Sequence, residues 1–270
     1  MSESLRKRAA TAAVMIALLL AVLFGLPADA TVALLTIVVL MGAWEWSAFL
    51  KWTDPRPRAA YVALIACLLP LAWLVTRTPA ALEALLAVAL LWWLVALVWI
   101  VAAPRRVGPW SAGLAGLLSL VPAWLALTRL RLEMARGAQW VLFALVLVWM
   151  ADIGAYFCGR RFGRRRLAPL VSPGKTWEGA LGGLAASAIV ALAGAAWFRL
   201  PLGRFLALCL VTVAFSIVGD LTESLLKRFA GMKDSGTLFP GHGGVMDRID
   251  SVTGAVPVLL LGLAFLGVLP

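Results

Sequence analysis

The stretch from Ser224 to Asp250 reads S-L-L-K-R-F-A-G-M-K-D-S-G-T-L-F-P-G-H-G-G-V-M-D-R-I-D and differs sharply from the rest of the chain. It is polar, charged and rich in glycine, and it contains the only histidine, His242. The segments on either side of it are long and apolar. We therefore predict that this stretch joins two membrane-spanning helices at a membrane boundary, with the rest of the chain as its scaffold.

The composition of the whole chain supports a membrane protein. The 270 residues are 63% hydrophobic and only 14% charged, with a mean hydropathy of +0.97. This excludes a soluble globular domain. The net charge of +11 is expected from Lys and Arg in loops beside anionic lipid, so we expect no nucleic-acid partner. The three cysteines show no C-x-x-C spacing, which disfavours a disulfide or a zinc site.

Nine apolar segments are long enough to cross a bilayer. They cover residues 9–26, 31–50, 59–76, 80–103, 110–128, 138–158, 177–198, 202–226 and 250–269. The predicted fold class is therefore all-α, a polytopic integral membrane protein with about nine transmembrane helices. We divide it into an N-terminal scaffold, residues 1–137, and a catalytic region, residues 138–270, with cytoplasmic loops at 159–176 and 227–249.

The distribution of positive charge predicts the orientation of these helices. Loops on the side of the N-terminus carry 18 of the 24 Lys and Arg residues. The positive-inside rule then places the N-terminus and the Ser224–Asp250 stretch in the cytoplasm. The basic run Arg6–Arg8 before an apolar segment resembles a signal peptide, but no polar mature domain follows it. We expect instead the first transmembrane helix of a protein in a bacterial inner membrane.

Three carboxylates in apolar surroundings are candidates for function. Asp152 lies about two turns inside the sixth predicted helix, where an unpaired carboxylate costs about 2.5–3.5 kcal/mol. We expect it to face water or to pair with a cation or a metal; an ion pair with an arginine of the next loop is the alternative. Glu45 and Glu83 lie near predicted helix ends, and their roles are left open.

The motif S-P-G-K-T-W-E-G, Ser172–Gly179, precedes the seventh predicted helix. Lys175 beside the free N–H groups of a helix start suits a phosphate, although a plain helix cap explains the motif too. The triplet G-K-T is similar to the end of a P-loop. We reject a P-loop because Pro169 occupies the position of its first glycine and the preceding segment is not predicted to be a strand.

The eighth predicted helix ends in G-D-L-T-E-S-L-L-K-R, and the ninth begins with D-R-I-D. If the eighth helix continues, one face carries Asp220, Glu223, Ser224 and Lys227, at positions i, i+3, i+4 and i+7. The alternative, a solvated helix end with a Glu223–Lys227 pair, leaves Asp220 unexplained. Asp247 and Asp250 also share a helical face, although acids at a helix N-terminus suit the dipole as well.

Carboxylates that converge from two neighbouring helix ends suit magnesium, and we predict Asp220 and Asp247 as its ligands. Several cations lie close enough in sequence to neutralise phosphate oxygens. They are Lys175, Lys227, Arg228, Lys233 and Arg248. Acids and cations together at a membrane surface favour phosphoryl or nucleotidyl transfer.

The stretch 224–250 resembles the signature of phosphatidate cytidylyltransferases, the CDP-diacylglycerol synthases. The matching positions are Ser224, Lys227-Arg228, Lys233-Asp234, His242-Gly243-Gly244 and Asp247-Arg248-Ile249-Asp250. The upstream motifs D-x-G-A-Y, S-P-G-K-T-W-E-G and G-D-L-T-E-S are similar to that family as well, so the resemblance covers about residues 140–260.

The resemblance implies the reaction of CTP with phosphatidate to give CDP-diacylglycerol and pyrophosphate. It also implies a magnesium requirement, alone or with a second cation, and a homodimer in the lipid bilayer. Asp220 and Asp247 would hold the metal and act in catalysis with Lys233 and Arg248. The implied substrate-binding residues are Ser172, Lys175, Glu178, Glu223, Lys227, Arg228, Asp234, His242, Asp250 and Asp152.

We compare three other functions with the sequence; the first stays open and the other two are disfavoured. A CTP-dependent lipid kinase would release CDP in place of pyrophosphate. A CDP-alcohol phosphatidyltransferase would need a D-G-x-x-A-R motif, which this chain lacks. A transporter would place acids near the midplane in both halves, whereas here they gather at one face of the second half.

Overall fold

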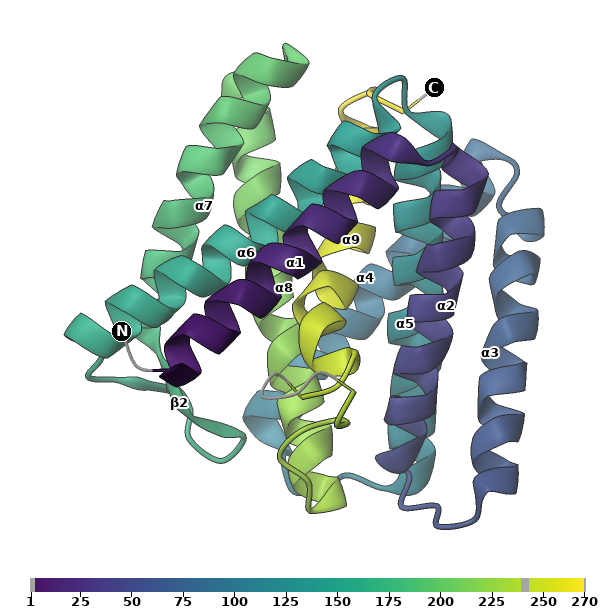
Figure 1. Ribbon diagram of the computed structural model, residues 1–270, viewed down its shortest axis with the longest axis vertical. Coiled ribbons are helices and arrows are strands. Elements are labelled where there is room, and N and C mark those ends of the chain that lie inside the picture. The colour runs from purple at the N-terminus through teal and green to yellow at the C-terminus, as the bar shows by residue number, and fades with distance from the viewer. Residues whose placement is uncertain (1–2, 239–242, 270) are drawn as a thin grey trace.

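The computed structural model describes residues 3–238 and 243–269, and these residues form nine α-helices and one β-hairpin (Figure 1). The helices are α1 (Glu3–Gly25), α2 (Ala28–Ala48), α3 (Pro55–Val75), α4 (Pro79–Ala102), α5 (Pro109–Glu133), α6 (Gly137–Phe162), α7 (Trp177–Phe198), α8 (Leu202–Ala230) and α9 (Met246–Phe265). Between α6 and α7, the antiparallel strands β1 (Arg166–Ala168) and β2 (Ser172–Thr176) pair Arg166 with Thr176 and Ala168 with Ser172.

The helices follow the predicted segments, and the differences lie at the polar ends. Helix α6 continues to Phe162 and α8 to Ala230, and α9 already begins at Met246. The connection between α8 and α9 is therefore shorter than the predicted loop 227–249. The prediction that no strand precedes the seventh helix is wrong, because the G-K-T triplet lies within β2. Pro169 still occupies the glycine position that a P-loop needs.

Eight of the described helices are long and apolar enough to cross a membrane, and α1 adds a shorter apolar part, Val14–Gly25. Helix α4 illustrates the apolar surface that such a helix presents to lipid. Its exposed side chains Val88, Leu91, Val95 and Val98 recur every three or four residues, and its buried face carries Trp93 and Ala96. The chain is thus a multi-pass membrane protein.

Helix α9 lies inside the bundle, and most of its residues from Ser251 to Leu263 are buried. It contacts α8 and α6 from the second half of the chain and α5, α4 and α2 from the first half. The division at residue 137 stays a prediction, and the helix that carries Asp247 packs against both sides of it. Figure 1 shows the hairpin, the α2–α3 connection and the start of α9 toward one end of the bundle, and the C-terminus at the other.

Small residues bring α6 and α7 into backbone contact. A Cβ atom added at Gly154 would collide with the carbonyl of Gly182 and the side chain of Ala186. One added at Gly183 would collide with the carbonyl of Ala151. Close packing of this kind is a main source of helix association in lipid, where the hydrophobic effect between helices is absent. It fixes α6, and with it Asp152, against the helix that follows the hairpin.

We predict that Gly154→Ala lowers the stability of the folded protein by about 1–3 kcal/mol, because α6 and α7 must separate to admit the methyl group. Thermal melting in detergent, followed by size-exclusion chromatography, measures the change. Gly203→Ala is the matched control, since a Cβ atom there meets nothing within 4 Å. Equal melting of the two variants would show that the close contact contributes little.

Candidate active site

The acidic ends of α8 and α9 meet because two glycines let their backbones touch. A Cβ atom at Gly219 would lie 2.6 Å from the carbonyl oxygen of Asp250, and one at Gly254 would collide with the carbonyl of Phe215. Larger residues would push the helices apart. The crossing therefore places Asp220, next to Gly219, within electrostatic reach of Asp250.

Asp220 forms an ion pair with Lys175 of β2, and its side chain is 26% exposed. Asp152 of α6 lies within electrostatic reach of Asp220, Asp250 and Lys175, and its side chain is exposed. The site thus combines three carboxylates from three helices with a lysine from the hairpin. The predicted pairing of Asp152 with a cation or a metal, or its contact with water, stays a prediction.

Asp247 is held by donors on both oxygens. Its Oδ1 accepts a hydrogen bond from Lys227 Nζ at 2.7 Å. Its Oδ2 accepts from the backbone N–H of Ser235 at 2.9 Å and from that of Gly244 at 2.8 Å, and lies 2.9 Å from the Ser235 hydroxyl. The side chain is only 9% exposed. This carboxylate therefore joins α8, the connecting segment and α9.

The predicted polar face of α8 is present. Glu223 is 1% exposed, and Lys227 Nζ lies 3.3 Å from its Oε2. Its other oxygen, Oε1, accepts no hydrogen bond from a donor among the described residues, and the carboxyl of Asp250 lies within hydrogen-bonding reach of the Glu223 carboxyl. Ser224 Oγ lies 3.5 Å from Asp220 Oδ1. The alternative Glu223–Lys227 pair also exists, and Asp220 has its own partner in Lys175.

The motif Ser172–Gly179 caps the start of α7, which was the alternative to a phosphate site. Thr176 Oγ1 accepts a hydrogen bond from the N–H of Gly179 at 3.1 Å. The carboxylate of Glu178 accepts from the backbone N–H groups of Arg164 and Arg165 at 3.0–3.3 Å. Glu178 thus supports the hairpin that carries Lys175. A direct role of Glu178 toward CTP stays a prediction.

The other predicted residues lie around this centre or outside the described part of the chain. Ser172 is half-buried in β2. Four predicted charged residues are exposed at the same end of the molecule: Arg228, Lys233, Asp234 and Arg248. His242 falls outside the described residues.

Among the residues that the structure describes, no three His, Cys, Asp or Glu side chains are grouped closely enough to hold a metal ion by themselves. Magnesium is a hard cation that takes a few carboxylates together with water and phosphate oxygens, so carboxylates are the right kind of donor for it. Asp152, Asp220 and Asp250 bring carboxylates within electrostatic reach of one another, and the carboxyl of Glu223 lies beside that of Asp250. Asp247, in contrast, already accepts from Lys227, Ser235 and Gly244. The Asp220–Asp247 metal pair stays a prediction.

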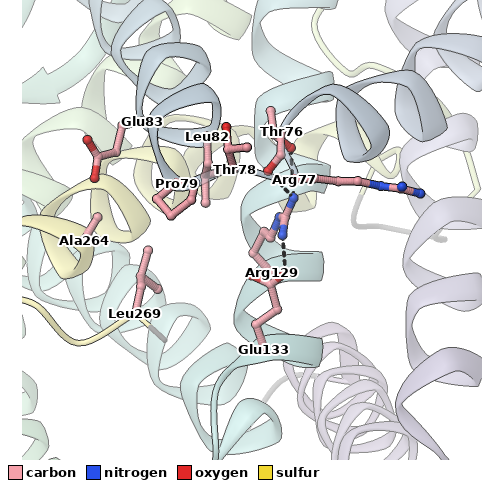
Figure 2. Close-up of a pocket in the computed structure, with 10 residues that line it drawn as sticks. All are labelled: Thr76, Arg77, Thr78, Pro79, Leu82, Glu83, Arg129, Glu133, Ala264 and Leu269. Carbon is pink, nitrogen blue, oxygen red and sulfur yellow. Dashed lines mark hydrogen bonds and ion pairs between the residues drawn. The ribbon is translucent and has the colours of Figure 1, made fainter.

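A separate cavity of about 550 Å³ is lined by the residues in Figure 2. They come from the ends of α3, α5 and α9 and the start of α4, so the cavity lies at the end of α9 opposite to Asp247. Arg129 there donates to Thr76 O at 2.6 Å, forms an ion pair with Glu133 and stacks on Trp73, so its charge has a partner within the protein. Glu83 lines this cavity and is therefore remote from Asp220. The cavity is not part of the candidate site.

Sequence reasoning did not assign Glu45 or Ser235 to the site. Glu45 of α2 accepts hydrogen bonds from the backbone N–H groups of Val245 and Met246. Its Oε2 also lies 2.8 Å from the hydroxyl of Ser235. The sequence did mark Glu45 as unusual, because it is an acidic residue within the apolar segment 31–50. Its partners could not be read from the sequence, because they lie about 200 positions away.

Comparison with known proteins gives similarities over nearly the full length. The pattern of the cytidylyltransferase family matches residues 6–266. A phosphatidate cytidylyltransferase of Pseudomonas aeruginosa is 44% identical over 277 residues, which cover 94% of this chain and 95% of that protein. One from Haemophilus influenzae is 38% identical over 278 residues, with 94% and 96% covered. One from Staphylococcus saprophyticus is 43% identical over 127 residues, which cover 46% of this chain and 49% of that protein.

Proposed function

The chain belongs to the cytidylyltransferase family, and from this premise we propose that it transfers the cytidylyl group of CTP to phosphatidate. The products are CDP-diacylglycerol and pyrophosphate, which makes the chain a nucleotidyltransferase of phospholipid biosynthesis. The observation that carries the proposal is the centre of Asp152, Asp220, Asp250 and Lys175 at one end of a membrane-spanning bundle. A lipid phosphate and a water-soluble nucleotide can meet at such a position.

In the proposed reaction, a phosphate oxygen of phosphatidate attacks the α-phosphorus of CTP. A new P–O bond forms there, and the bond from the α-phosphorus to the oxygen bridging to the β-phosphorus breaks, so that pyrophosphate leaves. The attacking phosphate is already anionic at neutral pH and needs no strong general base. The chain's task is to hold two anions together, which favours electrostatic over nucleophilic catalysis.

The cations of the site are proposed to receive the phosphate groups. Lys175 and Lys227 are held near the centre by Asp220 and by Asp247 with Glu223. Arg228 and Lys233 are exposed at the same end and can reach a nucleotide from solution. Ser172 and Lys175, which share β2, are proposed to face CTP.

We propose Asp220 and Asp247 as the residues that hold Mg²⁺, with Asp152 and Asp250 beside Asp220. When bound, the metal would reduce the repulsion between the two substrates and stabilise the negative charge of the leaving pyrophosphate. Binding at Asp247 requires one of its present donors to give way. Support for the pair is the chemistry of the acidic centre and the family resemblance.

We further propose that the protein lies in a bacterial inner membrane as a homodimer, with the site facing the cytoplasm. The excess of Lys and Arg in the loops on the side of the N-terminus supports this orientation. The family resemblance supports the dimer and the membrane. CTP is also a cytosolic compound, so this orientation gives the site access to it.

The test is an assay of the purified full-length protein with CTP, phosphatidate and Mg²⁺. We expect a CDP-lipid and one pyrophosphate for each CTP consumed. Release of CDP with no CDP-lipid would indicate the lipid kinase instead. The absence of any CTP-dependent lipid product would overturn the proposed function.

A further inference from the structure

Glu45 lies in the half of the chain that the site residues do not occupy, yet it contacts the segment between α8 and α9. Its Oε1 accepts a hydrogen bond from Val245 N at 3.0 Å, and its Oε2 accepts one from Met246 N at 2.8 Å. The hydroxyl of Ser235 lies 2.8 Å from Oε2. One carboxylate from α2 thus meets three donors of the connecting segment and of α9.

Two of these donors, the N–H groups of Val245 and Met246, lie at the start of α9. The cap residue of this helix, Val245, has no side chain able to accept a hydrogen bond, and none caps it locally. A helix start without a cap is less stable than a capped one. Glu45 supplies the cap from another helix, and Ser235 Oγ adds an acceptor for Asp247 N at 3.3 Å. The first turn of α9 is therefore held from outside, by α2 and by the connecting segment.

Ser235 links Glu45 to Asp247. Its hydroxyl lies 2.8 Å from Glu45 Oε2 and 2.9 Å from Asp247 Oδ2, so its single proton can serve either carboxylate. Its backbone N–H donates to Asp247 Oδ2. Two sets of contacts thus connect Glu45 with Asp247, one through Ser235 and one through the helix start.

Two glycines of the connecting segment make room for Glu45. A Cβ atom at Gly236 would collide with the carboxylate of Glu45, and one at Gly244 would collide with both Glu45 and Ser235. Gly244 belongs to the H-G-G part of the signature. Glu45, which lies far outside that signature, therefore explains why this position has no side chain.

The part of α2 that carries Glu45 is closely packed against other helices. The next residue, Trp46, is 1% exposed, and its indole N–H donates to the carbonyl of Ala112 on α5 at 2.8 Å. Gly42, about one turn earlier, leaves room for the side chain of Met246. A group that orients a catalytic side chain is effective when it stands on such a fixed element.

We infer that Glu45 is a positioning residue that holds Asp247 and the connecting segment in their working arrangement. The inference rests on the proposed function, since the arrangement matters through the reaction at Asp220 and Asp247. It assigns a role to the N-terminal half beyond that of a scaffold.

The first test is Glu45→Gln in the full-length protein, because glutamine keeps the size but turns an N–H donor toward the backbone donors. We expect kcat to fall about 10- to 100-fold while the KM for CTP changes less than about threefold. Glu83→Gln is the matched control, another acid of the N-terminal half, which lines the distant cavity and should retain wild-type kcat. Wild-type kcat in Glu45→Gln would overturn the inference.

The second test asks whether Glu45 acts through Ser235. If Glu45 acts through Ser235, then Glu45→Gln combined with Ser235→Ala should lose little more than the more damaging single change. Multiplying losses would contradict the route through Ser235.

The third test needs no activity and so distinguishes this inference from the proposed function. Trypsin should cleave after the exposed Lys233 several times faster in Glu45→Gln than in the wild type or in Glu83→Gln, at equal melting temperature. Unchanged cleavage would show that Glu45 does not hold the segment, even if the wild type makes no CDP-lipid.

Discussion

Replacing Asp220 by asparagine should lower the rate of CDP-diacylglycerol formation about 100- to 1,000-fold, the scale seen when one preorganised electrostatic group is removed. Asparagine has nearly the same shape but no charge. It would leave Lys175 without its ion-pair partner and would remove one of the two proposed metal ligands. The helix should persist, since the side chain is partly exposed and the backbone contact at Gly219 is unchanged.

The measurement is the rate of pyrophosphate release and of lipid product at saturating CTP and phosphatidate, over a range of Mg²⁺ concentrations. Asp29→Asn is the matched control, because Asp29 lies in the first turn of α2, at the end of that helix remote from Glu45. Its activity should equal that of the wild type. An Asp220→Asn enzyme within threefold of the wild type would show that neither the charge nor a metal at this position is needed.

The parts of the site that follow local periodicity could be predicted from the sequence. Asp220, Glu223 and Lys227 share a face because a helix repeats every 3.6 residues, and α8 does continue through them. The nine helices were also predictable, since a run of about 20 apolar residues has few other stable forms in lipid. Neither inference needs to know which helices are neighbours.

The parts that depend on tertiary contacts could not be predicted. The strands β1 and β2 are short, and Pro173 and Gly174 in β2 are residues that usually break strands. The ion pair between Lys175 and Asp220 depends on where this hairpin folds back. The predicted ends of α6 and α8, residues 158 and 226, lie four residues before the observed ends. Hydrophobicity marks only the apolar part of a helix, and both helices continue into the charged residues that follow.

The division of the acids into two groups also required the structure. The sequence places Asp220, Asp247 and Asp250 at two adjoining helix ends and cannot tell which of them meet. In the fold, Asp250 lies near Asp220, while Asp247 turns to Lys227, Ser235 and Gly244. A role of Asp220 in stabilising charge and a role of Asp247 in supporting the connecting segment can therefore be tested with separate variants.

Lys227→Met should destabilise the folded protein by about 3–5 kcal/mol, the cost of breaking one side of a buried ion pair. Lys227 is 12% exposed and lies 2.7 Å from Asp247 Oδ1 and 3.3 Å from Glu223 Oε2. Methionine fills the space but leaves two carboxylates without their cation, and Glu223 is 1% exposed. We expect a melting temperature in detergent lower by about 10 °C and a parallel loss of activity.

The control for position is Arg228→Met, the neighbouring cation, whose exposed side chain should change the melting temperature by little. The control for charge is Lys227→Met with Glu223→Gln, which removes the buried carboxylate along with its partner. If the destabilisation comes from an uncompensated buried charge, the double variant should recover a large part of the lost stability. A double variant that melts even lower than Lys227→Met would mean that Lys227 acts mainly through Asp247, and the support of the connecting segment would then be the larger contribution to stability.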